Sequence, residues 1–101
     1  HLAEDGVMII VATIDRETGN VLAGPDIVSR GFVYVRESEA LLDEAKQLMK
    51  QVMDNCRDRN IREWGNIKSA MRDALSDYIY SKTQRSPMIL PIIMEVQGKA
   101  D

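Results

Sequence analysis

The sequence contains few of the residues on which many functional sites depend. Its 101 residues include one cysteine, Cys56, and one histidine, His1. A single cysteine excludes an intramolecular disulfide and a cysteine-rich zinc site. Because His1 stands at the terminus, no histidine-based metal centre, catalytic triad or general base is available from within this chain. Cys56 falls on the apolar side of a predicted helix, so we expect it to be a buried core thiol.

The chain also lacks an excess of basic residues and any long apolar run. Thirteen Lys and Arg against sixteen Asp and Glu give a net charge of −3, the wrong sign for a protein whose whole surface attracts phosphate. The apolar runs at 7–14 and 87–96 are about half the length of a transmembrane helix, and the N-terminal residues do not resemble a signal peptide. We therefore expect a soluble, cytoplasmic protein without membrane contact, in which any contact with nucleic acid is local.

No catalytic motif is recognisable. There is no Gly-rich phosphate loop before a helix, no His-Glu pair on a helix, and no Ser or Cys beside a plausible base. The length fits one domain, which we place at residues 6–96, after the end of a linker at 1–5 and before a polar tail at 97–101. We expect this domain to have no enzymatic activity and no cofactor or metal of its own.

Periodicity predicts an α+β fold. Apolar, β-branched runs predict strands at 6–15, from Val21, and at 87–96; Gly19 suits a hairpin loop, and residues 24–26 predict a bulge or turn before a continuation through 27–36. Apolar residues at three- and four-residue spacing predict one helix from Ser38 to about Asn60 and a second from an N-cap at Asn66 to about Thr83. The order is ββ(β)ααβ, a small three- to four-stranded sheet with two helices packed on one face.

The last predicted strand is apolar on both sides, although two helices cover only one face of the sheet. An uncovered apolar face usually marks a partner surface, and we expect it to bind a second copy or an adjoining domain. We assign it five residues: Met8, Ile10, Ile14, Ile89 and Ile93. The alternative is that short, twisted strands let loops wrap the second face.

The stretch SRGFVYVR at 29–36 predicts a different surface. Alternation in a strand would place two aromatic and two arginine side chains on one face, as in sites where unpaired RNA bases stack. With a basic loop after the second helix, the candidate RNA contacts are Arg30, Phe32, Tyr34, Arg36, Lys82 and Arg85. The match to the RNA-recognition-motif signature is incomplete, and the alternative is that Phe32 and Tyr34 are core or interface residues flanked by surface arginines. A small-molecule regulatory module is disfavoured, because no polar cluster converges on a pocket.

Three stretches, TIDRETGNVLAGP at 13–25, GPDIVSRGFVYVRES at 24–38 and KTQRSPMILPIIMEV at 82–96, together resemble the C-terminal domain of bacterial ribonuclease J. The resemblance runs from about Asp5 to Val96. It implies an accessory domain of an enzyme that degrades and matures RNA as a 5′ to 3′ exonuclease and as an endonuclease, with zinc bound in an upstream catalytic domain. It also implies support of oligomer assembly and full activity, contact with the catalytic domains, and RNA binding by the parent enzyme as a whole.

Overall fold

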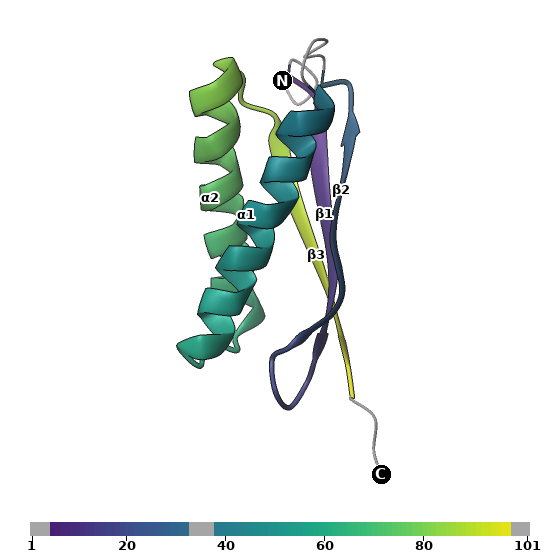
Figure 1. Ribbon diagram of the computed structural model, residues 1–101, viewed down its shortest axis with the longest axis vertical. Coiled ribbons are helices and arrows are strands. Elements are labelled where there is room, and N and C mark those ends of the chain that lie inside the picture. The colour runs from purple at the N-terminus through teal and green to yellow at the C-terminus, as the bar shows by residue number, and fades with distance from the viewer. Residues whose placement is uncertain (1–4, 33–37, 98–101) are drawn as a thin grey trace.

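The computed structural model describes residues 5–32 and 38–97. Its helices lie against one side of the sheet (Figure 1). The element order is β1 (Val7–Asp15), β2 (Val21–Arg30), α1 (Ser38–Asp58), α2 (Trp64–Thr83) and β3 (Met88–Val96). The predicted α+β class and the placement of both helices on one face are confirmed.

The sheet has the strand order β2-β1-β3, with β1 in the centre. β2 pairs antiparallel with β1 through a hairpin, and β3 returns after both helices to pair parallel with β1. Gly19 has φ +78° in the hairpin loop, a conformation that glycine adopts without steric penalty. The Asp15 carboxylate accepts the N–H of Glu17 (2.7 Å) and closes the same turn, so the predicted hairpin is confirmed.

β2 carries the predicted irregularity around residues 24–26. The register with β1 shifts between Val11 and Thr13, which is how a β-bulge changes a ladder. Gly24 has φ +84°, and a Cβ there would lie 2.6 Å from the Val11 carbonyl oxygen, so this position requires glycine. β2 nevertheless continues through the bulge to Arg30 as one strand. The predicted continuation is wrong at Gly31 and Phe32, which follow the end of β2, and its remaining residues, 33–36, lie outside the described part of the chain.

α1 starts at Ser38 as predicted and ends at Asp58, where Asn60 has φ +61° and the Ile61 N–H donates to the Cys56 carbonyl (2.8 Å). α2 starts three residues earlier than predicted. Its N-cap is Glu63, in extended conformation, whose carbonyl accepts the Ile67 N–H (3.0 Å). The N-cap prediction at Asn66 is therefore wrong, because the backbone of Glu63 begins the helix without a side-chain cap.

The core lies between the helix layer and the sheet. α1 packs on β2, α2 packs on β3, and the two helices pack on each other. The core comprises Met8, Ile10, Ala12, Ile14, Leu41, Ala45, Met49, Met53, Cys56, Ile67, Met71, Leu75, Ile79, Ile89 and Ile93. Cys56 is the predicted core thiol; burial raises its pKa, an effect that the charge of Arg59 partly offsets.

The assignment of Met8, Ile10, Ile14, Ile89 and Ile93 to the uncovered face is wrong. All five are buried beneath the helices. Because side chains alternate along a strand, the sheet still has a second apolar face. That face is formed by the residues next to these five in β1 and β3. Glu95 lies on the same side of β3 as Ile89 and Ile93. Its charge made that side appear to be the solvent-facing one in the sequence. In the structure Glu95 lies at the end of β3, where it pairs with Arg16 (3.5 Å).

Candidate interaction surface

The sheet face opposite the helices is apolar and exposed. We call it the open face. No described helix covers it, and the side chains on the two edge strands remain about half exposed, Ile92 at 45% and Met94 at 49%. Its apolar members are Val7, Ile9 and Val11 on β1, Val28 on β2, and Met88, Leu90, Ile92, Met94 and Val96 on β3. A contiguous patch of this kind is typical of a protein-binding surface.

The cross-strand register joins these residues into rows. Ile9 pairs with Val28 on one side and with Leu90 on the other, and Val11 pairs with Ile92. Directly opposite residues of neighbouring strands project to the same face. The open face is therefore a continuous apolar strip running across the sheet and along β3.

The free edge of β3 is a poorer docking surface than the open face. The Met88 N–H donates to the Gly6 carbonyl (2.9 Å), so the backbone groups of even-numbered residues in β3 point toward β1. Because these groups alternate sides along a strand, those of the odd-numbered residues, Pro91 among them, point to the free edge. Proline has no N–H, and on an edge strand it disfavours pairing with another chain.

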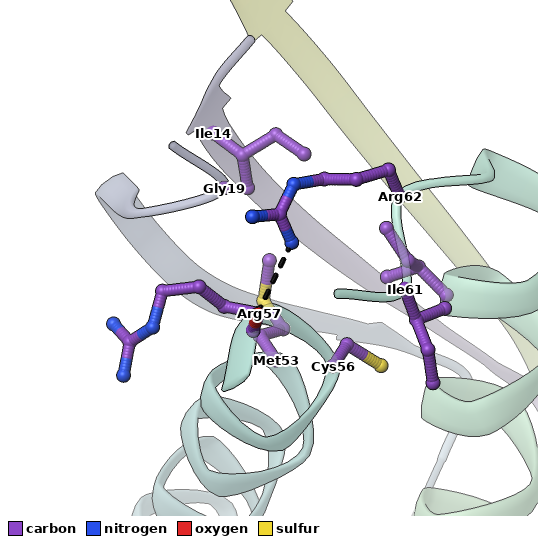
Figure 2. A pocket seen from close by; sticks show the side chains of 8 residues that line it. Ile14, Gly19, Met53, Cys56, Arg57, Ile61 and Arg62 are labelled. Carbon is purple, nitrogen blue, oxygen red and sulfur yellow. Dashed lines mark hydrogen bonds between the residues drawn. The ribbon is translucent and has the colours of Figure 1, made fainter. Parts of the chain in front are cut away.

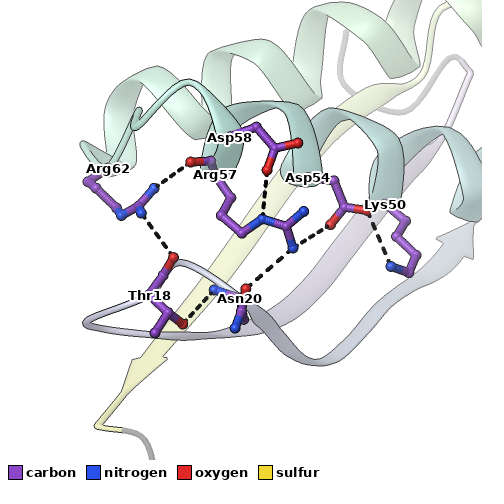
Figure 3. Close-up of polar contacts among 7 residues, drawn as sticks. All are labelled: Thr18, Asn20, Lys50, Asp54, Arg57, Asp58 and Arg62. Carbon is purple, nitrogen blue, oxygen red and sulfur yellow. Dashed lines mark hydrogen bonds and ion pairs between the residues drawn. The ribbon is translucent and has the colours of Figure 1, made fainter.

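The hairpin end of the sheet is fastened to the helices by two arginines (Figure 3). Arg62 donates from Nη2 to the Thr18 carbonyl (2.9 Å) and from Nη1 to the Arg57 carbonyl (3.3 Å). Arg57 donates to the Asn20 side-chain oxygen (3.3 Å) and forms ion pairs with Asp54 and Asp58. These contacts fix the β1–β2 loop against the end of α1.

A small pocket lies beneath these arginines (Figure 2). Its wall is mostly apolar and includes Ile14, Met53, Cys56 and Ile61, with Arg62 across its mouth. Its internal volume of ≈ 10 Å³ is about what one water molecule requires. The pocket is too small for a metabolite, so it favours a packing role.

On the helix side, Tyr78 of α2 donates a short hydrogen bond to the Glu44 carboxylate of α1. Burial raises the pKa of Tyr78 to about 12, with further contributions from the hydrogen bond and the charge of Glu44. The Lys82 ammonium lies 5.8 Å from the centroid of the Tyr78 ring, within the range of a cation–π contact. The hydrogen bond between Tyr78 and Glu44 joins the two helices.

The structure only partly assembles the candidate RNA contacts. Arg30 at the end of β2, Lys82 at the end of α2 and Arg85 before β3 gather at one end of the molecule. Phe32, however, is half-buried and packs against the core. Tyr34 and Arg36 lie among residues 33–37, outside the described part.

Contacts within the chain also reduce the charge at this end. Arg85 forms an ion pair with Asp5 (3.6 Å), and Lys82 is engaged with the Tyr78 ring. A stacking platform needs an exposed aromatic face beside free cations. Phe32 does not supply that face, so the described residues of the segment do not form the predicted platform.

Within residues 5–32 and 38–97 no three His, Cys, Asp or Glu side chains lie close enough together to hold a metal ion. The described helices are each too polar or too short to cross a membrane.

Comparison with known proteins decides the family. The model of the ribonuclease J C-terminal domain matches residues 1–96. The chain belongs to the ribonuclease J C-terminal domain family. Curated relatives include ribonuclease J2 of Bacillus subtilis and ribonuclease J 2 of Staphylococcus saprophyticus, both 47% identical over 95 residues. Ribonuclease J 2 of Staphylococcus aureus is 46% identical over the same length.

In each of these three matches 94% of this chain aligns with only 17% of the relative. The chain thus spans about one sixth of the length of these ribonuclease J proteins. The expected resemblance to ribonuclease J is confirmed. The open-face residues are the part of the candidate site that sequence reasoning assigned to the wrong side of the sheet.

Proposed function

We propose that this domain is a non-catalytic accessory domain of a ribonuclease J-type enzyme and that it supports oligomer assembly and full activity. In this proposal the parent degrades and matures RNA as a 5′ to 3′ exonuclease and an endonuclease in the cytoplasm. Zinc and phosphodiester hydrolysis belong to the upstream part of the parent. The observation that carries the proposal is the open face, an apolar surface that the domain leaves uncovered although its core is complete without it.

The partner that best fits the open face is a second copy of the domain. Two sheets pack face to face at about 10 Å, and side chains from the two inner faces interdigitate. Docking through the face leaves the free edge of β3, with Pro91, unpaired. The catalytic part of the parent is the other candidate partner, and it predicts a different outcome in the experiment below.

The size of the face limits how strong this contact can be. Three strands at ~4.8 Å spacing and about nine residues at ~3.3 Å rise give a footprint of about 400 Å². Stable interfaces bury roughly 800 Å² per partner. We therefore expect the domain alone to associate weakly, and the full enzyme to gain strength from other contacts or from linkage of several weak ones.

The test uses the full-length parent enzyme with a lysine at the centre of the open face. Ile92→Lys should shift oligomers toward smaller species in sedimentation velocity and lower RNA turnover, because it buries an unpaired charge in the contact. Ser69→Lys, on the exposed side of α2, is the matched control and should change neither.

The outcomes separate the possible partners. Loss of both assembly and turnover supports the proposal. Intact assembly with impaired turnover would mean that the open face contacts the catalytic part of the same copy. Unchanged assembly and turnover would refute a role for the open face in the enzyme. Circular dichroism of each variant checks that the fold is retained.

A further inference from the structure

Two opposite charges stand on the open face at the β2 edge. Asp26 pairs with Val11 and Arg30 pairs with Val7, with Val28 midway between them. Residues two apart project to the same face and lie about 6.7 Å apart along the strand. Both charged side chains are exposed, and within the described ranges neither forms an ion pair. The charges are thus placed symmetrically about Val28, with opposite signs.

A symmetric pair of domains brings each surface into contact with itself, so that residue i meets residue j and j meets i. Suppose the two-fold axis runs across the strands through the row of Val28, Ile9 and Leu90. Each Val28 then lies over its own counterpart, and Arg30 of one copy lies over Asp26 of the other. The exchange occurs twice, once on each side of the axis.

The other symmetric arrangements do not match these charges. An axis through Val11 brings the two Asp26 carboxylates together, and an axis through Val7 brings the two Arg30 guanidiniums together. An axis parallel to the strands lays β2 of one copy over β3 of the other, which places Asp26 over Ile92. Each alternative juxtaposes like charges or buries an unpaired one.

Charge repulsion favours the arrangement centred on Val28. Its disadvantage is that Met94 and Val96, both about half exposed, lie two and three rows from the axis and are covered less well than with an axis through Val11. The burial of two half-exposed side chains is a smaller effect than the repulsion of like charges brought together in an interface. Opposite charges at the rim of an interface contribute mainly to orientation.

We infer that Asp26 and Arg30 determine the orientation of a two-fold, face-to-face pairing of this domain with a second copy of itself. The inference rests on the proposed function, since it requires the open face to be the contact. The apolar strip supplies the attraction, and the two charges select one orientation among those that the strip alone would allow.

The experiment measures self-association of the full-length parent by sedimentation equilibrium, without RNA, at low and moderate salt. The variants are Asp26→Asn, Arg30→Gln and the exchanged double variant Asp26→Arg/Arg30→Asp. Each single variant should raise the dissociation constant by about fivefold to tenfold, because each removes two ion pairs of typical rim strength. The double variant should return to within about threefold of the wild type, and the effects should shrink as salt rises.

Four results would overturn the inference. Tighter association of Asp26→Asn would mean that the carboxylates face each other or face apolar side chains. A double variant weaker than both single variants would mean that the two residues do not meet. If Ile92→Lys abolishes association while none of these charge variants changes it, the open face is the contact and only the orientation is wrong. If Ile92→Lys also has no effect, the proposed function fails as well.

Discussion

Two adjacent isoleucines test the arrangement of faces within one strand. Ile93 is 6% exposed beneath the helices, whereas Ile92 is 45% exposed on the open face. Substitution by alanine removes the same atoms at both positions. Complete burial of the three lost carbon groups is worth about 2.4 kcal/mol, and a cavity adds to this in a packed core. We therefore expect Ile93→Ala to lower the free energy of unfolding by about 3 kcal/mol.

Ile92→Ala should lower it by only about 1 kcal/mol, because half of that side chain is already in water and no cavity forms. The assay is urea denaturation of the 101-residue chain, followed by circular dichroism at low micromolar concentration. The gap should narrow at higher concentration, where self-association buries Ile92 as well. Equal losses at low concentration, or a larger loss for Ile92→Ala, would contradict the assigned faces.

Three further predictions concern the polar contacts. The free energy of unfolding should fall as pH rises from about 10 to about 12, because folded Tyr78, with its pKa raised to about 12, keeps a proton that the unfolded side chain loses near its ordinary pKa of 10.0. Urea titrations at several pH values should show a weaker dependence of the unfolding free energy on pH for Tyr78→Phe. An unchanged pH dependence in that variant would contradict the raised pKa of Tyr78. Arg62→Met should destabilise the chain by about 1–2 kcal/mol through loss of two hydrogen bonds from a charged group, while Arg59→Met, at an exposed position, should have little effect in the same denaturation assay. Lys82→Ala/Arg85→Ala should leave the affinity of the parent for single-stranded RNA unchanged within about twofold, and a loss of one or two units of salt slope in a titration would instead restore the RNA-contact hypothesis.

The features predicted correctly from the sequence depend on local signals. The hairpin follows from Gly19 in a loop between apolar runs, and the bulge from Gly24 and Pro25 inside a strand. The helices follow from apolar residues at helical spacing, which the packing of both helices on the sheet preserves. The start of α2 was misplaced because its first turn depends on the backbone conformation of Glu63, for which the sequence offers no side-chain signal.

The two faces of the sheet could not be distinguished from β1 or β3 alone, because both strands are apolar on each side. β2 contains the missing signal. Asp26 and Arg30 flank Val28 and must face solvent or a polar partner, and through the ladder they share a side with Val11 and Val7. The bulge shifts the register between the hairpin loop and these residues. Counting residues from the hairpin loop therefore does not reveal which β1 residues lie on the same face as Asp26 and Arg30.

The SRGFVYVR stretch illustrates a different limit. Alternation places Arg30 and Phe32 on one side only if the strand continues, and β2 ends at Arg30. Beyond that point Gly31 has φ +71°, which changes the direction of the chain and lets Phe32 pack against the core. A period of two cannot be extended across a residue in that conformation.

Folding and assembly use different residues in this domain. The fifteen core residues lie between helices and sheet, so a substitution on the open face leaves their packing intact. Each half-exposed residue of the open face would gain roughly 1 kcal/mol on burial, which makes at most about 5 kcal/mol for the five such residues of each copy, Val28, Leu90, Ile92, Met94 and Val96. Two copies together gain at most about 10 kcal/mol, within the range of ~4–15 kcal/mol that association loses in translational and rotational freedom. The open face alone therefore gives weak pairing. In the parent enzyme, any additional contact that holds two copies together would turn this weak pairing into stable assembly.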